Sequence, residues 1–145
     1  YIKPANQTDN ISGIIGTVLI CFMYLSLFRV VPVTSLIIMP AAGFSNLMIL
    51  SKVIKRDLEN TSILKYCGNY HIIAAFGISF LSAAILNYKL IISLSLMFML
   101  SGLIVSILDK RIKNVPSSVE GFIIEVSQIM FLIITYVIRF GDTPL

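Results

Sequence analysis

A carboxyl group and an amide lie one helical turn apart inside the last apolar run of the chain. Glu125 and Gln128 belong to the run 117–138, in which most of their neighbours are aliphatic. If this run forms a helix from Ser117, Glu125 lies about 12 Å along its axis at a rise of about 1.5 Å per residue, and Gln128 shares its face. A carboxyl group so deep in apolar surroundings has to be paired or protonated, which makes this a candidate functional or interfacial position.

The second candidate for chemistry is His71, the one histidine of the chain, which stands near the start of the apolar run 66–86. The helical rise gives it a depth of about 9 Å, comparable to that of Glu125 on a helix of the same direction. We therefore expect a candidate polar pair, with Asn69, Tyr66 or Tyr70 close by. In contact, the two groups would stabilise each other's charged form and could transfer a proton. The alternative is a boundary histidine whose ring is hydrogen-bonded locally.

The residue sets that other kinds of catalytic or metal site require are not found in the sequence. The sequence shows no Ser-His-Asp set, no glycine-rich phosphate loop and no carboxylate cluster suited to a divalent metal, and Cys21 and Cys67 form no CxxC pair. A lone histidine can ligate haem iron, but no second axial ligand is evident. Glu120 is explained by a capping box with Ser117. The sequence thus predicts no metal and no catalytic residue, and it identifies no cofactor.

Composition tells which elements must position these side chains. The chain has 145 residues, of which 57% are hydrophobic and 12% charged, and its mean hydropathy is +0.95. Soluble domains carry about 25% charged residues, and about 20 apolar residues form one bilayer-spanning helix. We expect an all-α integral membrane protein, one bundle of four to five transmembrane helices over residues 1–145. A water-soluble enzyme is excluded.

Five apolar runs are the candidate spans. The second contains Pro40, which removes a hydrogen bond from the middle of a helix, so it is expected to span with a kink or to be re-entrant, a form that requires protein or water to satisfy the freed backbone groups. The spans are expected at about 11–28, 31–50, 66–86, 90–108 and 117–138.

The basic residues indicate an orientation. The net charge is +4, but the eleven lysines and arginines stand between the apolar runs and form no single patch, so we expect no nucleic-acid partner. Eight fall on the side of loops 51–65 and 109–118 and three on the other, with five spans or four. These loops are therefore predicted on the cytoplasmic or equivalent side. With five spans, the three on the other side are Arg29, Lys89 and Arg139; Arg29 and Arg139 are expected to be snorkelling anchors.

Small residues at helical spacing predict close helix packing. In lipid, helices associate by packing more than by the hydrophobic effect, and small residues let their backbones approach. We expect these faces to hold the bundle together internally; the alternative is an interface with another subunit. The residues are Ala75, Ser79 and Ala83 in the third run, Gly13 and Gly16 in the first, and Gly102 and Ser106 in the fourth.

The second half of the chain resembles a known group. The stretch from Lys65 to Tyr70 leads into a small-residue helix, Gly102 and Ser106 precede a polar turn, and Pro116 opens the helix that carries Glu125. This layout is similar to that of small four-helix bacterial membrane proteins of unassigned function, the DoxX-like group. An arginine expected after the glycine of the penultimate helix is replaced here by leucine. The resemblance implies a helical bundle and no particular activity.

Two functions follow from these observations. The sequence favours a non-catalytic integral membrane subunit or assembly factor of a larger membrane complex, because its loops are short, its small-residue faces numerous and its catalytic sets absent. The alternative is a small membrane enzyme or transporter that acts on a lipid-like or protonatable substrate through Glu125 and His71. A lipid-headgroup site at the basic loops would need a pocket there, of which the sequence shows no sign. The expected partners are the lipid bilayer and other integral membrane subunits.

Overall fold

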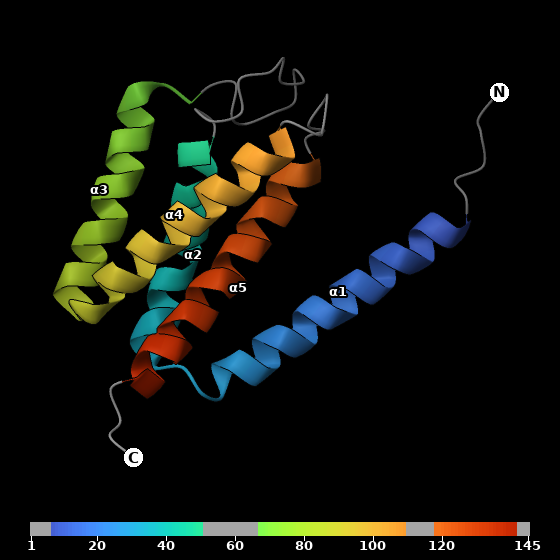
Figure 1. Ribbon diagram of the computed structural model, residues 1–145, viewed down its shortest axis with the longest axis horizontal. Coiled ribbons are helices and arrows are strands. Elements are labelled where there is room, and N and C mark those ends of the chain that lie inside the picture. The colour runs from blue at the N-terminus through green and yellow to red at the C-terminus, as the bar shows by residue number, and fades with distance from the viewer. Residues whose placement is uncertain (1–6, 51–66, 110–117, 142–145) are drawn as a thin grey trace.

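The described part of the chain is entirely helical. The structure is a computed structural model and describes residues 7–50, 67–109 and 118–141. These residues form five helices and no strand, which confirms the all-α expectation, and consecutive helices run in alternating directions (Figure 1). The helices are α1 (Gln7–Phe28), α2 (Val33–Leu50), α3 (Asn69–Leu86), α4 (Lys89–Asp109) and α5 (Ser118–Gly141).

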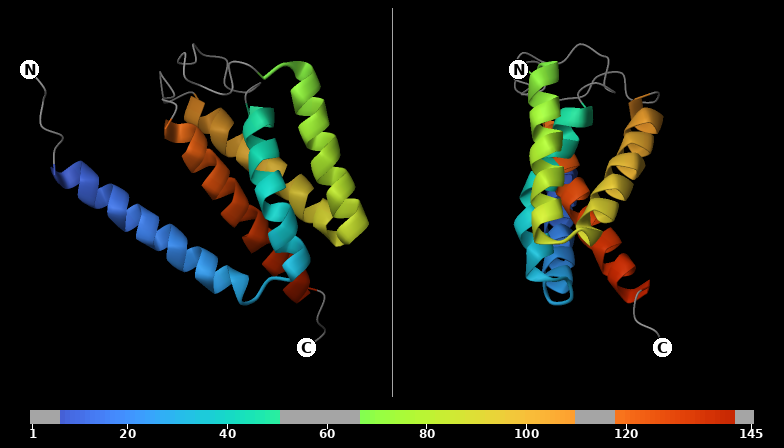
Figure 2. Two further views of the ribbon diagram at one scale, coloured as in Figure 1. Left: turned by 180° about the vertical axis from the view of Figure 1, so that it is seen from behind. Right: turned by 90° about the vertical axis from the view of Figure 1, so that its left-hand side faces the viewer.

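Helix α2 lies at the centre of the bundle. It packs against α3, α4 and α5, and α4 in turn packs against α3 and α5 (Figure 2). The interior is formed where these four helices meet, by fully buried aliphatic and aromatic side chains. Its largest members are Ile38 of α2, Leu94 and Met97 of α4, and Phe131 and Leu132 of α5.

Helix α1 stands away from the other four. Its last turns approach α5, and its N-terminal part diverges from the bundle (Figures 1 and 2). Most large apolar side chains of α1 are consequently exposed, from Ile14 to Phe28. This helix therefore buries little of its surface within the chain.

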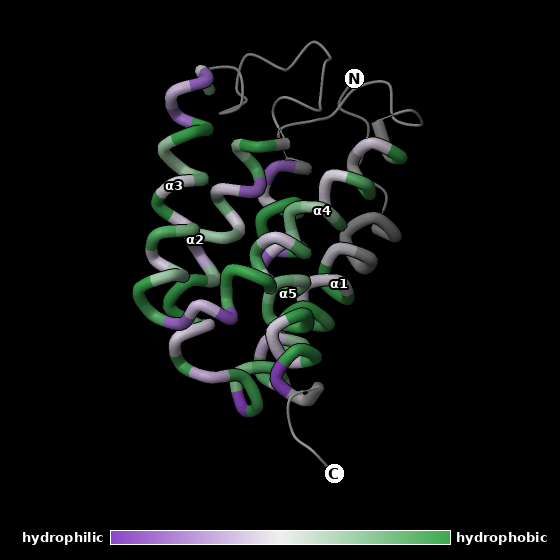
Figure 3. The backbone as a smooth tube through the Cα atoms, turned by 60° about the vertical axis from the view of Figure 1, so that its left-hand side comes forward, coloured by the Kyte–Doolittle hydropathy of each residue, from purple (hydrophilic) through white to green (hydrophobic). Residues whose placement is uncertain are grey.

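The interior is richer in hydroxyl groups than the exterior. Buried serine and threonine side chains come from all four central helices, whereas isoleucine, leucine and phenylalanine occupy much of the exposed surface. Figure 3 shows apolar residues along the length of the helices, interrupted at few positions. The buried hydroxyl groups belong to Ser35, Ser45, Ser79, Ser93, Ser101, Ser127 and Thr135.

Two helices are long and apolar enough to cross a membrane. These are Asn69–Leu86 and Glu120–Arg139, and the apolar stretches of the other three described helices are shorter. Only 11% of the first window and 33% of the second are buried inside the chain. Helix α3 therefore exposes most of its apolar residues, whereas the window of α5 exposes Phe122, Ile133 and Val137 and buries its other large apolar side chains partly or fully.

The second apolar run forms one continuous helix. Val33–Leu50 contains Pro40 and runs the length of the bundle beside α5 (Figure 1), so the backbone does not reverse direction within these residues. The helix begins after Pro32, whose carbonyl oxygen accepts a hydrogen bond from the Ser35 N–H group (2.9 Å). The basic loops 51–65 and 109–118 and the capping box of Ser117 fall almost wholly outside the described residues.

Candidate functional site

The Glu125 carboxyl group and the Gln128 amide meet the hydroxyl group of Tyr24. The Tyr24 hydroxyl lies 2.7 Å from Glu125 Oε2 and 2.8 Å from Gln128 Oε1. Both residues belong to α5, and their spacing of three places them on the face that meets α1. Gln128 is buried and the other two are partly buried. We call these three residues the tyrosine cluster.

The Tyr24 hydroxyl group makes two short contacts in the tyrosine cluster but has only one proton to donate. A phenol has a single proton, so Tyr24 donates to only one of its two partners. The other must donate to the phenol oxygen, as the Gln128 amide turned by 180° or as Glu125 in its carboxylic acid form. The cluster can thus hold a proton in more than one hydrogen-bond pattern.

Gly43 of α2 makes room for the tyrosine cluster. A Cβ atom at this position would lie 2.7 Å from Gln128 Cγ and 3.0 Å from Gln128 Nε2. Such distances are far shorter than ordinary carbon contacts of about 3.5–4.0 Å. The glycine therefore lets the Gln128 side chain pass directly over the α2 backbone on its way to Tyr24.

A second polar cluster links three helices in the interior. Asn46 of α2 donates from Nδ2 to Ser127 Oγ of α5 (2.6 Å) and accepts at Oδ1 from Ser101 Oγ of α4 (2.7 Å). Ser127 also donates to the Ile123 carbonyl oxygen (2.6 Å). Asn46 is fully buried, so these bonds replace the hydration that its amide loses. Because Ser127 and Gln128 are adjacent, α5 connects this cluster to the first.

The structure does not bring His71 to Glu125. His71 is exposed in the first turn of α3, and its Nδ1 accepts a hydrogen bond from the Gly68 N–H group at 3.3 Å. It closes the N-terminus of α3, as the local alternative expected. Among the described residues no hydrogen bond or ion pair joins it to Glu125, because α3 packs on α2 and α4 while Glu125 faces α1. Tyr70, another expected neighbour, is 80% exposed.

The small-residue faces divide into two kinds. Ser79 and Ala83 of α3 are buried, and Ser45 of α2 donates to the Ala75 carbonyl oxygen (3.0 Å) and contacts Ser79 Oγ, so the face with Ala75 holds α3 to α2 as expected. By contrast, a Cβ atom at Gly13, Gly16 or Gly102 would meet nothing within 4 Å, and Ser106 is exposed. The prediction that Gly13, Gly16, Gly102 and Ser106 pack inside the bundle was therefore wrong. Helix α1 diverges from the bundle, and this part of α4 faces outward.

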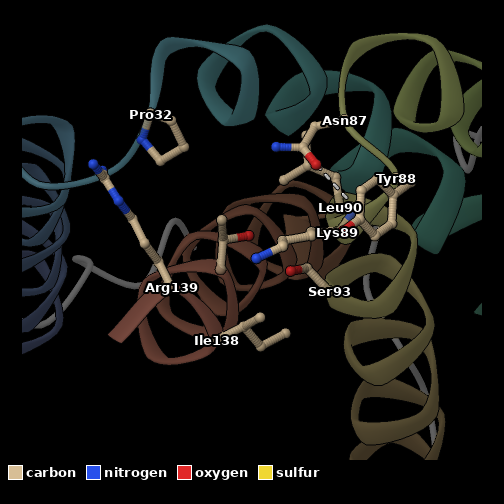
Figure 4. Close-up of a pocket in the computed structure, with 9 residues that line it drawn as sticks. Pro32, Asn87, Tyr88, Lys89, Leu90, Ser93, Ile138 and Arg139 are labelled. Carbon is tan, nitrogen blue, oxygen red and sulfur yellow. Dashed lines mark hydrogen bonds between the residues drawn. The ribbon is translucent and has the colours of Figure 1, made fainter. Parts of the chain in front are cut away.

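A cavity of about 440 Å³ opens at the end of the bundle opposite the starts of α3 and α5. Its walls come from the α1–α2 connection, the α3–α4 turn and the last turns of α5 (Figure 4). Lys89 and Arg139 bring positive charge to it, and Ser93 and Thr135 bring hydroxyl groups. It touches neither the tyrosine cluster nor the Asn46 cluster.

Sequence reasoning did not find Tyr24, Asn46 as a hydrogen-bonding centre, or the terminal cavity. Asn46 stands in an apolar run, and a polar side chain in such a run is expected to face the bundle interior, so this signal was present. For Tyr24 the position within the run gives no comparable signal, because tyrosine is common at exposed helix ends. The cavity joins residues from segments far apart in the sequence, which no local pattern reveals.

Within the described residues, no group of three or more histidine, cysteine or acidic side chains could hold a metal ion. The resemblance to the DoxX-like group stays a prediction, and function has to be argued from the geometry. The chain matches no protein-family model, and no curated protein and no solved structure is significantly similar to it.

Proposed function

We propose that the chain is an integral membrane protein whose helices form a bundle of four to five spans. The best support is the distribution of side chains: hydroxyl and amide groups are buried, and large apolar side chains are exposed. A core helix of a soluble protein is mostly buried, whereas the spanning window of α3 is 11% buried. In lipid, by contrast, exposed apolar side chains are solvated, and helices associate through small residues and interhelical hydrogen bonds.

Within the membrane, the proposed role is that of a non-catalytic subunit or assembly factor of a larger complex. The observation that carries this proposal is the divergence of α1 from the bundle (Figure 2). The helix is tied to α5 near its end by Tyr24, and Arg139 donates to the Val30 carbonyl oxygen (3.2 Å) just after it. The rest of α1 exposes apolar side chains and the open positions Gly13 and Gly16. A transmembrane helix of another subunit would fit against such a face, since small residues permit close backbone approach.

Purification of the native protein in nanodiscs, followed by mass determination, tests this role. If the proposal is right, other membrane proteins purify together with the chain in a defined stoichiometry. A chain that runs alone or as a homo-oligomer would refute it.

A substitution on α1 tests where the partner docks. Gly16→Leu should weaken the complex at least fivefold, because the new side chain occupies the docking face. Gly77→Leu on α3 is the matched control, since a Cβ atom there also meets nothing within 4 Å. Equal retention of partners by the two variants would contradict docking on α1.

A second candidate is a small membrane enzyme or transporter for a lipid-like or protonatable species. The tyrosine cluster favours it, because a carboxyl group, a phenol and an amide meet there and can exchange a proton. This candidate function depends on Glu125 alone, because His71 lies apart from it at the start of α3. Glu125→Gln separates the two functions: a loss of turnover at unchanged abundance would favour this candidate, whereas altered assembly or no effect would favour the subunit.

A further inference from the structure

The terminal cavity combines features that suit an anion. Lys89 lies at the start of α4, and Arg139 lies in the last turn of α5. Figure 4 shows the Lys89 side chain extending towards the Ser93 hydroxyl, with Arg139 on the side of Pro32. None of the described residues that line the cavity is acidic, and two of them, Lys89 and Arg139, carry a positive charge.

The N-terminus of α4 adds to this positive potential. Asn87 Oδ1 accepts a hydrogen bond from the Lys89 N–H group (3.0 Å), which fixes the start of the helix at the cavity wall. A helix of 21 residues such as α4 carries about half a positive charge at its N-terminus, where anions are stabilised. The helix terminus and the two side chains thus act in the same direction.

Hydroxyl groups supply the hydrogen-bonding surface. Ser93, one turn into α4, is 1% exposed and lines the cavity. Thr135 of α5 is also buried, and its hydroxyl group donates to the Phe131 carbonyl oxygen (2.8 Å). A buried serine hydroxyl beside cationic side chains can donate a hydrogen bond to an anionic oxygen.

We propose that the terminal cavity binds a phosphate ester anion, held by Lys89, Arg139 and Ser93. Its volume of about 440 Å³ falls within the roughly 300–1,000 Å³ of small-molecule sites, so it accommodates the phosphate together with the alcohol to which it is esterified. The apolar side chains of Pro32, Leu90 and Ile138 line the remainder. The anion has two possible sources, the headgroup of an anionic phospholipid or a soluble phosphate monoester, and the lipid source rests on the proposed membrane placement.

Native mass spectrometry of the full chain in detergent tests the site. The probes are dioleoylphosphatidylglycerol, dioleoylphosphatidylcholine and glycerol 3-phosphate, each titrated separately. The proposal expects at least one of the two anionic probes to bind about tenfold tighter than the choline lipid, and Lys89→Gln and Arg139→Gln each to weaken that binding about tenfold. Both side chains are exposed, so the variants should fold. Arg29→Gln is the matched control, because Arg29 is an exposed cation within the α1–α2 connection and does not line the cavity.

The outcomes of this titration tell a lipid headgroup from a soluble phosphate ester, and either of these from the absence of an anion site. Preference for phosphatidylglycerol with no binding of glycerol 3-phosphate identifies a lipid headgroup, and binding of glycerol 3-phosphate alone identifies a soluble ester. No preference for either anionic probe overturns the proposal, as does an equal loss of binding in the Arg29 and Lys89 variants. Because Gly16 lies far along α1 from this cavity, the partner experiment and the lipid experiment fail independently of each other.

Discussion

At the scale of single residues, Tyr24 is the side chain on which the position of α1 depends most. Its hydroxyl group joins α1 to two polar side chains of α5. Tyr24→Phe should lower the free energy of unfolding by about 1–3 kcal/mol, because Glu125 and Gln128 each lose a partner while partly or fully out of water. Thermal unfolding in detergent measures the change. Tyr70→Phe is the control, since Tyr70 is largely exposed; equal losses in both variants would mean that the tyrosine cluster does not stabilise the fold.

Ser35 gives a prediction of opposite sign. Its Oγ atom is buried at the start of α2 and, among the described residues, is the one such side-chain atom without a hydrogen-bond partner. A buried hydroxyl group left without a partner is destabilising, so Ser35→Ala should raise the free energy of unfolding by about 1 kcal/mol. Ser45→Ala, assayed by the same thermal unfolding, should instead lower it, because Ser45 bonds to Ala75 and Ser79. Destabilisation by Ser35→Ala would imply that this hydroxyl group has a partner in the native protein.

At the scale of the helices, α5 organises the polar interior. Its face with Gln128 meets α1 and α2, and its neighbour Ser127 belongs to the network with Asn46 and Ser101. The association of α2 with α5 depends on the absence of a side chain at Gly43. The two helices are therefore in direct contact where both polar clusters lie.

Gly43→Ala tests this close approach. The added methyl group would overlap the Gln128 side chain, so we expect a loss of about 1–3 kcal/mol, typical of overpacking, and a weaker bond from Gln128 to Tyr24. Gly77→Ala is the control, because nothing lies within 4 Å of its Cβ position and alanine is the better helix former. Unfolding of both variants in the same detergent gives the comparison. A Gly43 variant as stable as the Gly77 variant would show that α5 can shift without loss.

Much of this helical arrangement could be predicted from the sequence, and the contacts between helices could not. The apolar runs gave the five helices to within a few residues, and the spacing of Glu125 and Gln128 gave their common face, because both depend on local periodicity. The partner of Glu125 depends on which helix packs beside α5, and an expected depth does not determine that: His71 was expected at a similar depth but lies in the first turn of α3. Pro40 was likewise ambiguous, since its effect on the path of α2 depends on the helices around it.

At the scale of the whole molecule, hydroxyl groups are buried and many aliphatic side chains are exposed, as the proposed membrane bundle requires, and the basic side chains are grouped by end. The helix ends that carry or adjoin Arg29, Lys89 and Arg139 lie at one end of the bundle (Figure 1). The eight remaining basic residues belong to segments that precede α1 or connect the helices at the other end. This distribution is the one that sets orientation in membranes, since the end richer in lysine and arginine stays on the cytoplasmic side.

Cysteine labelling tests this orientation in intact cells with a membrane-impermeant thiol reagent. Cys21 and Cys67 are first replaced by serine, and single cysteines are then introduced at Tyr88 in the α3–α4 turn and at Asn114 in the second basic loop. Because eight basic residues favour one side and three the other, the cysteine at position 88 should react in intact cells, and that at position 114 only after permeabilisation. The reverse pattern would invert the topology, and equal reaction at both positions in intact cells would refute a membrane-spanning arrangement. The labelled side also decides from which side the anion of the terminal cavity must come.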